Sequence, residues 1–207
     1  MKKILLAFVM LGAATSFAQN DKQAVQSMVD TFTSALEERE IFTYLTTTRY
    51  CDGNIQMIKM PNGRMCASKG TFYETYIFWQ EEGKSYGKKI DNCGMFGSIE
   101  LPDSEVYDYF TTHFEAIRSN PVKGYEIAQK ETGPLQRTEI NNCHKSFTLS
   151  NTDDTFSQKF NPFDLTNDAV EANIHYEYNQ KLKIVHLDSL LDTAIKQIEG
   201  SANFIRI

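Results

Sequence analysis

Apolar side chains recur along the chain at two spacings, and each spacing predicts a different kind of element. Residues 21–39, 103–119 and 189–199 carry them at intervals of three and four positions, which is typical of one buried helix face. In the first segment they are Val25, Met28, Val29, Phe32 and Leu36. Asp21 belongs to a residue type that caps helix starts, so the sequence predicts three helices, with Asp21 capping the first.

Extended segments are predicted between these helices. Their ranges are 54–60, 71–80, 85–92, 123–130, 136–149, 172–178 and 182–187. Asn62-Gly63 is a hairpin signal after the first of them, because both residue types accept positive φ. Residues 41–50 are expected to form a helical turn that leads into a strand. The polar residues 150–171 are expected to form a long loop.

The segment 71–80 is apolar on both of its alternating faces. A two-residue loop to the next strand would place Trp79 opposite Tyr86 and Thr75 opposite Ile90. One face would then carry Tyr73, Thr75, Ile77 and Trp79, and the other would carry Phe72, Tyr76 and Phe78. A strand with two apolar faces is predicted to lie in the middle of a sheet that is covered on both sides.

The order of these elements is helix, three strands, helix, four strands, helix. A parallel sheet would show a regular alternation of strands and helices, which is missing here. The sequence therefore predicts an α+β fold in which a mainly antiparallel sheet packs with about three helices. We expect one domain over residues 19–207.

The start of the chain has the three parts of a secretory leader. Lys2 and Lys3 are basic, residues 4–14 are almost unbroken apolar, and Ser16-Phe17-Ala18 is a small-x-small cleavage site. Cleavage is expected between Ala18 and Gln19, which would make the protein periplasmic or secreted. No later segment of the sequence approaches the ~20 apolar residues of a membrane helix, so stable insertion after processing is not expected.

The charge of the processed chain is acidic. The full chain has 21 Lys and Arg against 27 Asp and Glu, and the leader removes two lysines, which leaves 19 against 27 and a net charge of −8. No basic stripe offsets this charge, so nucleic acid is not an expected partner.

Four cysteines, Cys51, Cys66, Cys93 and Cys143, lie in the processed chain. An even number in an oxidising compartment predicts two disulfides, for which three pairings exist. The favoured pairing is Cys51–Cys66 with Cys93–Cys143, because the first pair brackets the expected hairpin. No Cys-x-x-Cys spacing supports a zinc site or a redox thiol.

Motifs for catalysis, metals or cofactors are missing from the sequence. His175 and His186 fall in two strands of a predicted hairpin, where pairing of the apolar faces sends them to opposite sides, so no metal ligand is assigned. Cys143 and His144 are neighbours in a strand and therefore point to opposite faces. No catalytic residue and no cofactor is predicted.

The aromatic hairpin is the last candidate for a site. Tyr76, Trp79 and Tyr86 would be ligand-facing if they were exposed, but the two apolar strand faces favour a place in the core. The preferred hypothesis is an exported, non-catalytic domain that binds a small molecule or a protein. The alternative is a small exported hydrolase whose active-site residues are dispersed along the chain.

Processing should leave Gln19 as the first residue, because Ser16 and Ala18 provide the small side chains at the cleavage site. Intact-mass analysis of the exported protein should therefore match residues 19–207. A mature form that retains Met1 would contradict the leader.

Overall fold

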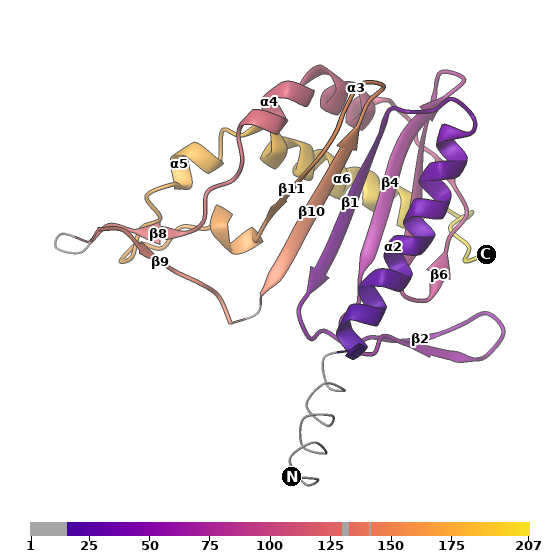
Figure 1. Ribbon diagram of the computed structural model, residues 1–207, viewed down its shortest axis with the longest axis horizontal. Helices are drawn as coiled ribbons and strands as arrows, with labels where there is room; N and C mark the ends of the chain where they lie inside the picture. The colour runs from indigo at the N-terminus through magenta and orange to yellow at the C-terminus, as the bar shows by residue number, and fades with distance from the viewer. Residues whose placement is uncertain (1–15, 130–132, 141) are drawn as a thin grey trace, which may run out of the picture.

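The computed structural model describes residues 16–129, 133–140 and 142–207. Within these residues it confirms the α+β class, with an antiparallel seven-stranded sheet and helices on both of its faces (Figure 1). The first part of the predicted leader, residues 1–15, lies outside the described residues. None of the described helices has the length and apolarity needed to cross a membrane.

The large sheet contains β1 (Tyr44–Cys51), β4 (Glu74–Glu81), β5 (Lys84–Asp91), β6 (Gly94–Met95), β7 (Ile99–Glu100), β10 (Cys143–Ser150) and β11 (Thr155–Phe160). Its order is β11-β10-β1-β4-β5-β6, and β7 also pairs with β5. Two small sheets join β2 (Met57–Lys59) to β3 (Met65–Ala67) and β8 (Glu126–Ile127) to β9 (Leu135–Gln136). The helices are α2 (Ser16–Glu37), α3 (Glu105–Thr112), α4 (Phe114–Ser119), α5 (Tyr176–Asn179) and α6 (Lys183–Gly200), with a 3₁₀ turn η1 at Pro162–Leu165.

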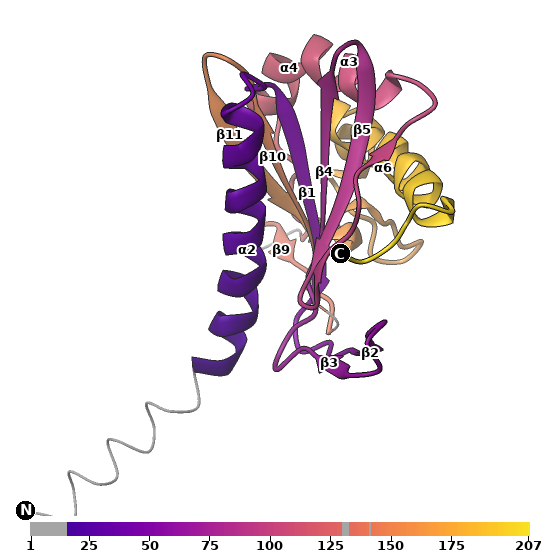
Figure 2. The ribbon, with the colours of Figure 1, turned by 90° about the vertical axis from the view of Figure 1, so that its right-hand side faces the viewer.

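The central strand β4 has the predicted register and the predicted two-sided burial. Trp79 lies opposite Tyr86, and Thr75 lies opposite Ile90. One core packs α2 against the sheet through Val25, Val29, Leu36, Tyr44, Tyr73, Ile77, Trp79 and Ile90. The other core includes Tyr76 and Phe78 and packs the opposite face against α3, α4 and α6. Figure 2 shows the sheet edge-on between these two layers.

The predicted last hairpin, 172–178 with 182–187, is wrong. Those residues contain α5 and the beginning of α6. The residues of α6 that are buried are Ile184, Leu187, Asp188, Leu191, Ala194, Ile195 and Ile198. This helical spacing continues for four turns, whereas alternation near Leu182 and Ile184 involves only two positions and fits either period. The predicted helix 189–199 therefore starts earlier, at Lys183.

Other predicted boundaries differ because pairing with neighbouring strands stabilises segments whose local sequence pattern does not indicate a strand. The expected loop 150–171 contains β11 and η1, and β11 pairs along its length with β10. Residues 44–51 are strand throughout, because β1 pairs with both β10 and β4. The hairpin at Asn62-Gly63 closes on β3, a strand that the pattern did not predict. The helix predicted over 103–119 is interrupted at His113, between α3 and α4.

The two predicted disulfides are present, but the pairing that the sequence favoured is wrong. Cys51 bonds to Cys143 and Cys66 bonds to Cys93. Cys51 lies directly opposite Cys143 at the end of the β1–β10 ladder. Inside the small hairpin Cys66 lies opposite Ile58, so the hairpin does not bring it to Cys51. The sequence could not indicate this pairing, because β1 and β10 are separated by 92 residues at the cysteines.

Peptide mapping without reduction should recover the links Cys51–Cys143 and Cys66–Cys93, because the pairs close across strands that are already aligned. In the chain-entropy model loops of these lengths contribute about 3–5 kcal/mol each. A mapped Cys51–Cys66 link would contradict the β1–β10 register.

Replacing Trp79 by alanine should lower the free energy of unfolding by about 3–5 kcal/mol, as large-to-small changes in cores do. Trp79 is 2% exposed, and its ring centroid lies 5.2 Å from that of Phe32 and 5.5 Å from that of Tyr86. Urea unfolding followed by circular dichroism measures the change. The matched control is Phe42→Ala, at a ring that is 43% exposed, which should cost about 0.5–1 kcal/mol. Equal losses in both variants would contradict the burial of Trp79.

Candidate functional site

A cleft of about 270 Å³ lies between α2 and the half of the sheet that α2 leaves open. The helix packs against β5 and β6, and β10 and β11 lie to one side of it in Figure 1. The cleft is lined by Lys22, Val25, Gln26, Val29, Thr46, Thr48, Tyr50, Tyr73, Thr75, Ser146, Thr148, Ser157 and Lys159. It is thus a surface of the sheet with one helical wall.

The floor of the cleft is a lattice of hydroxyl groups, contributed by Thr46, Thr48, Thr75, Ser146, Thr148 and Ser157. Cross-strand register produces it, because Thr48 lies opposite both Ser146 and Thr75 in neighbouring strands. The Thr48 and Thr75 hydroxyl oxygens are 2.9 Å apart, and those of Thr148 and Ser157 are 2.8 Å apart. Each hydroxyl in such a pair keeps further donor or acceptor capacity for a ligand.

Alternation along β1 explains why the hydroxyls share one face. Thr46 and Thr48 face α2 and the cleft, whereas Leu45 and Thr47 are fully buried toward the other side of the sheet. Threonine is branched at Cβ and is favoured in strands, so it forms the strand while presenting a polar group. The same alternation in β10 places Ser146 and Thr148 on the cleft side.

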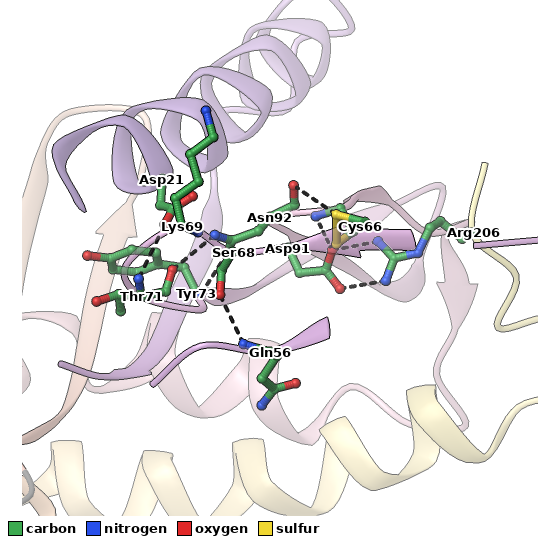
Figure 3. Close-up of a disulfide and its surroundings, with 11 residues drawn as sticks. Asp21, Gln56, Cys66, Ser68, Lys69, Thr71, Tyr73, Asp91, Asn92 and Arg206 are labelled. Atoms are coloured by element: carbon green, nitrogen blue, oxygen red, sulfur yellow. Dashed lines mark hydrogen bonds and ion pairs between the residues drawn. A yellow bond between two sulfur atoms is a disulfide. The ribbon is translucent and has the colours of Figure 1, made fainter. Parts of the chain in front are cut away.

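The helical wall consists of Lys22, Val25, Gln26 and Val29, which lie on one face of α2 by their spacing. Asp21 holds this end of α2 in place. One of its carboxylate oxygens accepts the backbone N–H groups of Lys69, Gly70 and Thr71 at 2.8, 2.7 and 3.2 Å (Figure 3). Its predicted role as a helix cap is wrong, because α2 begins at Ser16 and Asp21 lies within the helix.

Two tyrosines form one end of the cleft. The ring centroids of Tyr50 and Tyr73 lie 4.8 Å apart. Burial raises the pKa of both phenols above its usual value, and the charge of Asp52 raises both further. Both groups are therefore protonated at neutral pH, so they present O–H groups rather than negative charge.

The charged groups that line the cleft are both lysines. Lys22 comes from the helical wall, α2, and Lys159 comes from β11 in the sheet. The described lining residues contain no aspartate, glutamate, histidine or cysteine. The cleft is therefore rich in hydroxyls, and the charged side chains among its described lining residues are the exposed lysines Lys22 and Lys159.

The aromatic residues singled out in the sequence lie in other places. Trp79 is buried under α2, as the two-sided strand predicted, and the half-buried ring of Tyr86 stacks on it. Tyr76 lies on the opposite face of the sheet, where its hydroxyl donates to Glu199 at 2.7 Å. None of the three is among the residues that line the cleft. The run Thr46-Thr47-Thr48 was a visible signal, but most of its hydroxyl partners in the cleft come from β10 and β11, which lie about a hundred residues away.

A second set of polar residues lies between the sheet and α6. Lys145 Nζ lies 2.6 Å from Asp188, and Arg49 lies 2.5 Å from Asp192. Lys89 bridges Glu74 at 2.5 Å and Glu199 at 2.7 Å. Burial raises the pKa of Asp188, while the bound Lys145 opposes the rise. Because opposite charges are paired throughout, we interpret this network as the polar part of the contact that holds α6 on the sheet.

The histidines and the cysteines do not form a shared site. His175 bonds to Glu126 at 3.1 Å, and the ring of His186 packs against Tyr109. His144 lies 3.3 Å from Asp52, while Cys143 is in a disulfide. Within the described ranges no group of three or more His, Cys, Asp or Glu side chains is arranged to hold a metal ion.

Comparison with known proteins gives no relative. No protein-family model, curated protein or solved structure matches this chain. A function is therefore argued from the cleft itself.

Proposed function

We propose that the protein is an exported, non-catalytic binding protein whose cleft beside α2 takes a small anionic molecule rich in hydroxyl groups, such as a hexuronate. The observation that carries this proposal is the lining of the cleft, which combines six serine and threonine hydroxyls with Lys22 and Lys159. Export rests on the leader, and the two disulfides are compatible with an oxidising compartment.

The hydroxyl lattice suits a ligand that both donates and accepts hydrogen bonds. Serine and threonine hydroxyls can do either, and rotate to suit the partner. A sugar-like ligand can also both donate and accept hydrogen bonds, so it can replace water at these hydroxyls. The phenol groups of Tyr50 and Tyr73 add an aromatic end against which a ring can rest.

The two lysines favour a negative charge on the ligand. No described lining residue carries an opposite charge that would neutralise them within the cleft. A volume of about 270 Å³ lies just below the range of roughly 300–1,000 Å³ found for drug-sized ligands, so a single sugar-sized molecule is the appropriate scale.

The lining of the cleft favours binding over hydrolysis. An activated hydroxyl nucleophile needs an adjacent base, usually histidine or a carboxylate, within hydrogen-bond distance. The described lining residues supply neither, and Thr48 and Ser157 have hydroxyl partners instead. The hydrolase hypothesis would need another location, and the acidic groups beside α6 are already paired with Lys145, Arg49 and Lys89.

Glucuronate should raise the melting temperature of the mature protein more than glucose or sulfate does, because only glucuronate offers both hydroxyls and a carboxylate. At a hundredfold excess over Kd the stabilisation is about 2.7 kcal/mol, which corresponds to about 5–10 °C for a domain of this size. Differential scanning calorimetry measures the shift.

Lys159→Gln and Thr148→Val should each reduce the glucuronate shift, because they remove a charge and a hydroxyl from the lining. Lys181→Gln is the matched control, since Lys181 is exposed and does not line the cleft. The proposal is wrong if glucuronate acts no better than sulfate, or if Lys181→Gln weakens binding as much as Lys159→Gln.

A further inference from the structure

We propose that the hairpin β2–β3, residues 57–67, docks the mature protein reversibly on the surface of an anionic membrane. The hairpin projects beyond the end of the large sheet (Figure 2). This surface is separate from the cleft, so its test does not depend on the proposed ligand.

The hairpin exposes large apolar side chains where a globular protein usually hides them. Met57 is 70% exposed and Met65 is 57% exposed. Cross-strand register pairs Met57 with Ala67 and Lys59 with Met65, so these four side chains share one face. Ile58 and Cys66 form the other, less exposed face, which leads to the disulfide. Ile55, just before β2, adds a further exposed apolar side chain.

The charge of this region is opposite to that of the chain. Residues 53–73 contain Lys59, Arg64 and Lys69 and no aspartate or glutamate, whereas the full chain has a net charge of −6. Lys59 and Arg64 are exposed beside the two methionines. Exposed apolar groups flanked by cations are the combination by which peripheral proteins bind anionic lipid, through apolar burial together with electrostatic attraction.

The hairpin is held in place although it buries little of its own surface. Two strands of three residues are at best marginally stable alone. Here the Cys66–Cys93 disulfide links them to the turn after β5, and the N–H of Gln56 donates to the Ser68 hydroxyl at 3.0 Å (Figure 3). The disulfide therefore fixes the hairpin to the sheet while its apolar face stays exposed.

The position of the hairpin favours a membrane surface over a small ligand as its partner. The N-terminal end of α2 lies at the same end of the molecule, and Asp21 binds the backbone of residues 69–71 just after β3. Methionine is flexible and unbranched, which suits insertion among acyl chains.

Cosedimentation with vesicles tests the proposal on the mature protein. The wild type should bind phosphatidylglycerol–phosphatidylcholine vesicles, and bind pure phosphatidylcholine vesicles far more weakly. The double variant Lys59→Gln with Arg64→Gln removes both cations and should weaken partitioning about 30-fold. Each cation contributes about fivefold, or ~1 kcal/mol. Met57→Ser with Met65→Ser should also weaken binding. Added salt should weaken the binding of the wild type.

Matched controls are available elsewhere on the chain. Ile140→Ser with Val170→Ser removes two apolar side chains that are 101% and 91% exposed, and Lys181→Gln with Lys196→Gln removes two exposed cations. Both should bind as the wild type does. The fluorescence of Trp79, the only tryptophan, reports that each variant is folded.

The proposal is overturned if the wild type fails to sediment with the anionic vesicles, or if the hairpin variants bind them as well as the controls do. Binding to polyglutamate without binding to vesicles would also overturn it, because the hairpin would then recognise an acidic chain and not a lipid surface.

Discussion

The two apolar faces of β4 are the constraint that shapes this protein. Ile77 and Trp79 need cover on one side, and Tyr76 and Phe78 need it on the other. A sheet that is apolar on both sides of its middle strand cannot leave either side in water, so helices must pack on both. On one side α3, α4 and α6 supply a broad layer, and on the other α2 alone does so. A single helix is too narrow for the whole sheet, and the uncovered strands β10 and β11 accordingly carry hydroxyls.

The cleft and the hairpin depart from the usual distribution of side chains in opposite ways. In the cleft, polar groups such as Thr46 occupy a recessed part of the sheet, where apolar residues would extend the core. On the hairpin, Met57 and Met65 face solvent, where polar residues would be expected. Departures of this kind are expected at functional sites, because elsewhere local preference and overall fold agree. Asp21 connects the two regions, since it lies on α2 and binds the loop that follows β3.

Local patterns predicted the parts of the fold that depend on neighbours in sequence. The helix over 21–39, the β4–β5 register and the burial of Trp79 all follow from spacing within about twenty residues. The register and the burial are confirmed, and the helix is found with other bounds, from Ser16 to Glu37. The pairing of β1 with β10, the correct disulfides and the cleft depend on contacts between distant segments, which no local period encodes. The last hairpin failed for another reason, because the alternation at Leu182 and Ile184 was too short to distinguish a strand from a helix.

Pairing of β1 with β10 has a consequence for the order in which the chain can fold as it is synthesised. The first strand of the sheet lies between β4 and β10, and its residue Cys51 closes on Cys143, 92 positions later. As the chain is synthesised from its N-terminus, β1 can pair with β4 early, but its other edge stays open until residues 143–150 emerge. An unpaired strand edge invites association with other chains. Newly synthesised molecules therefore pass through an interval in which β1 is exposed to its neighbours, and this interval ends only when most of the polypeptide has emerged.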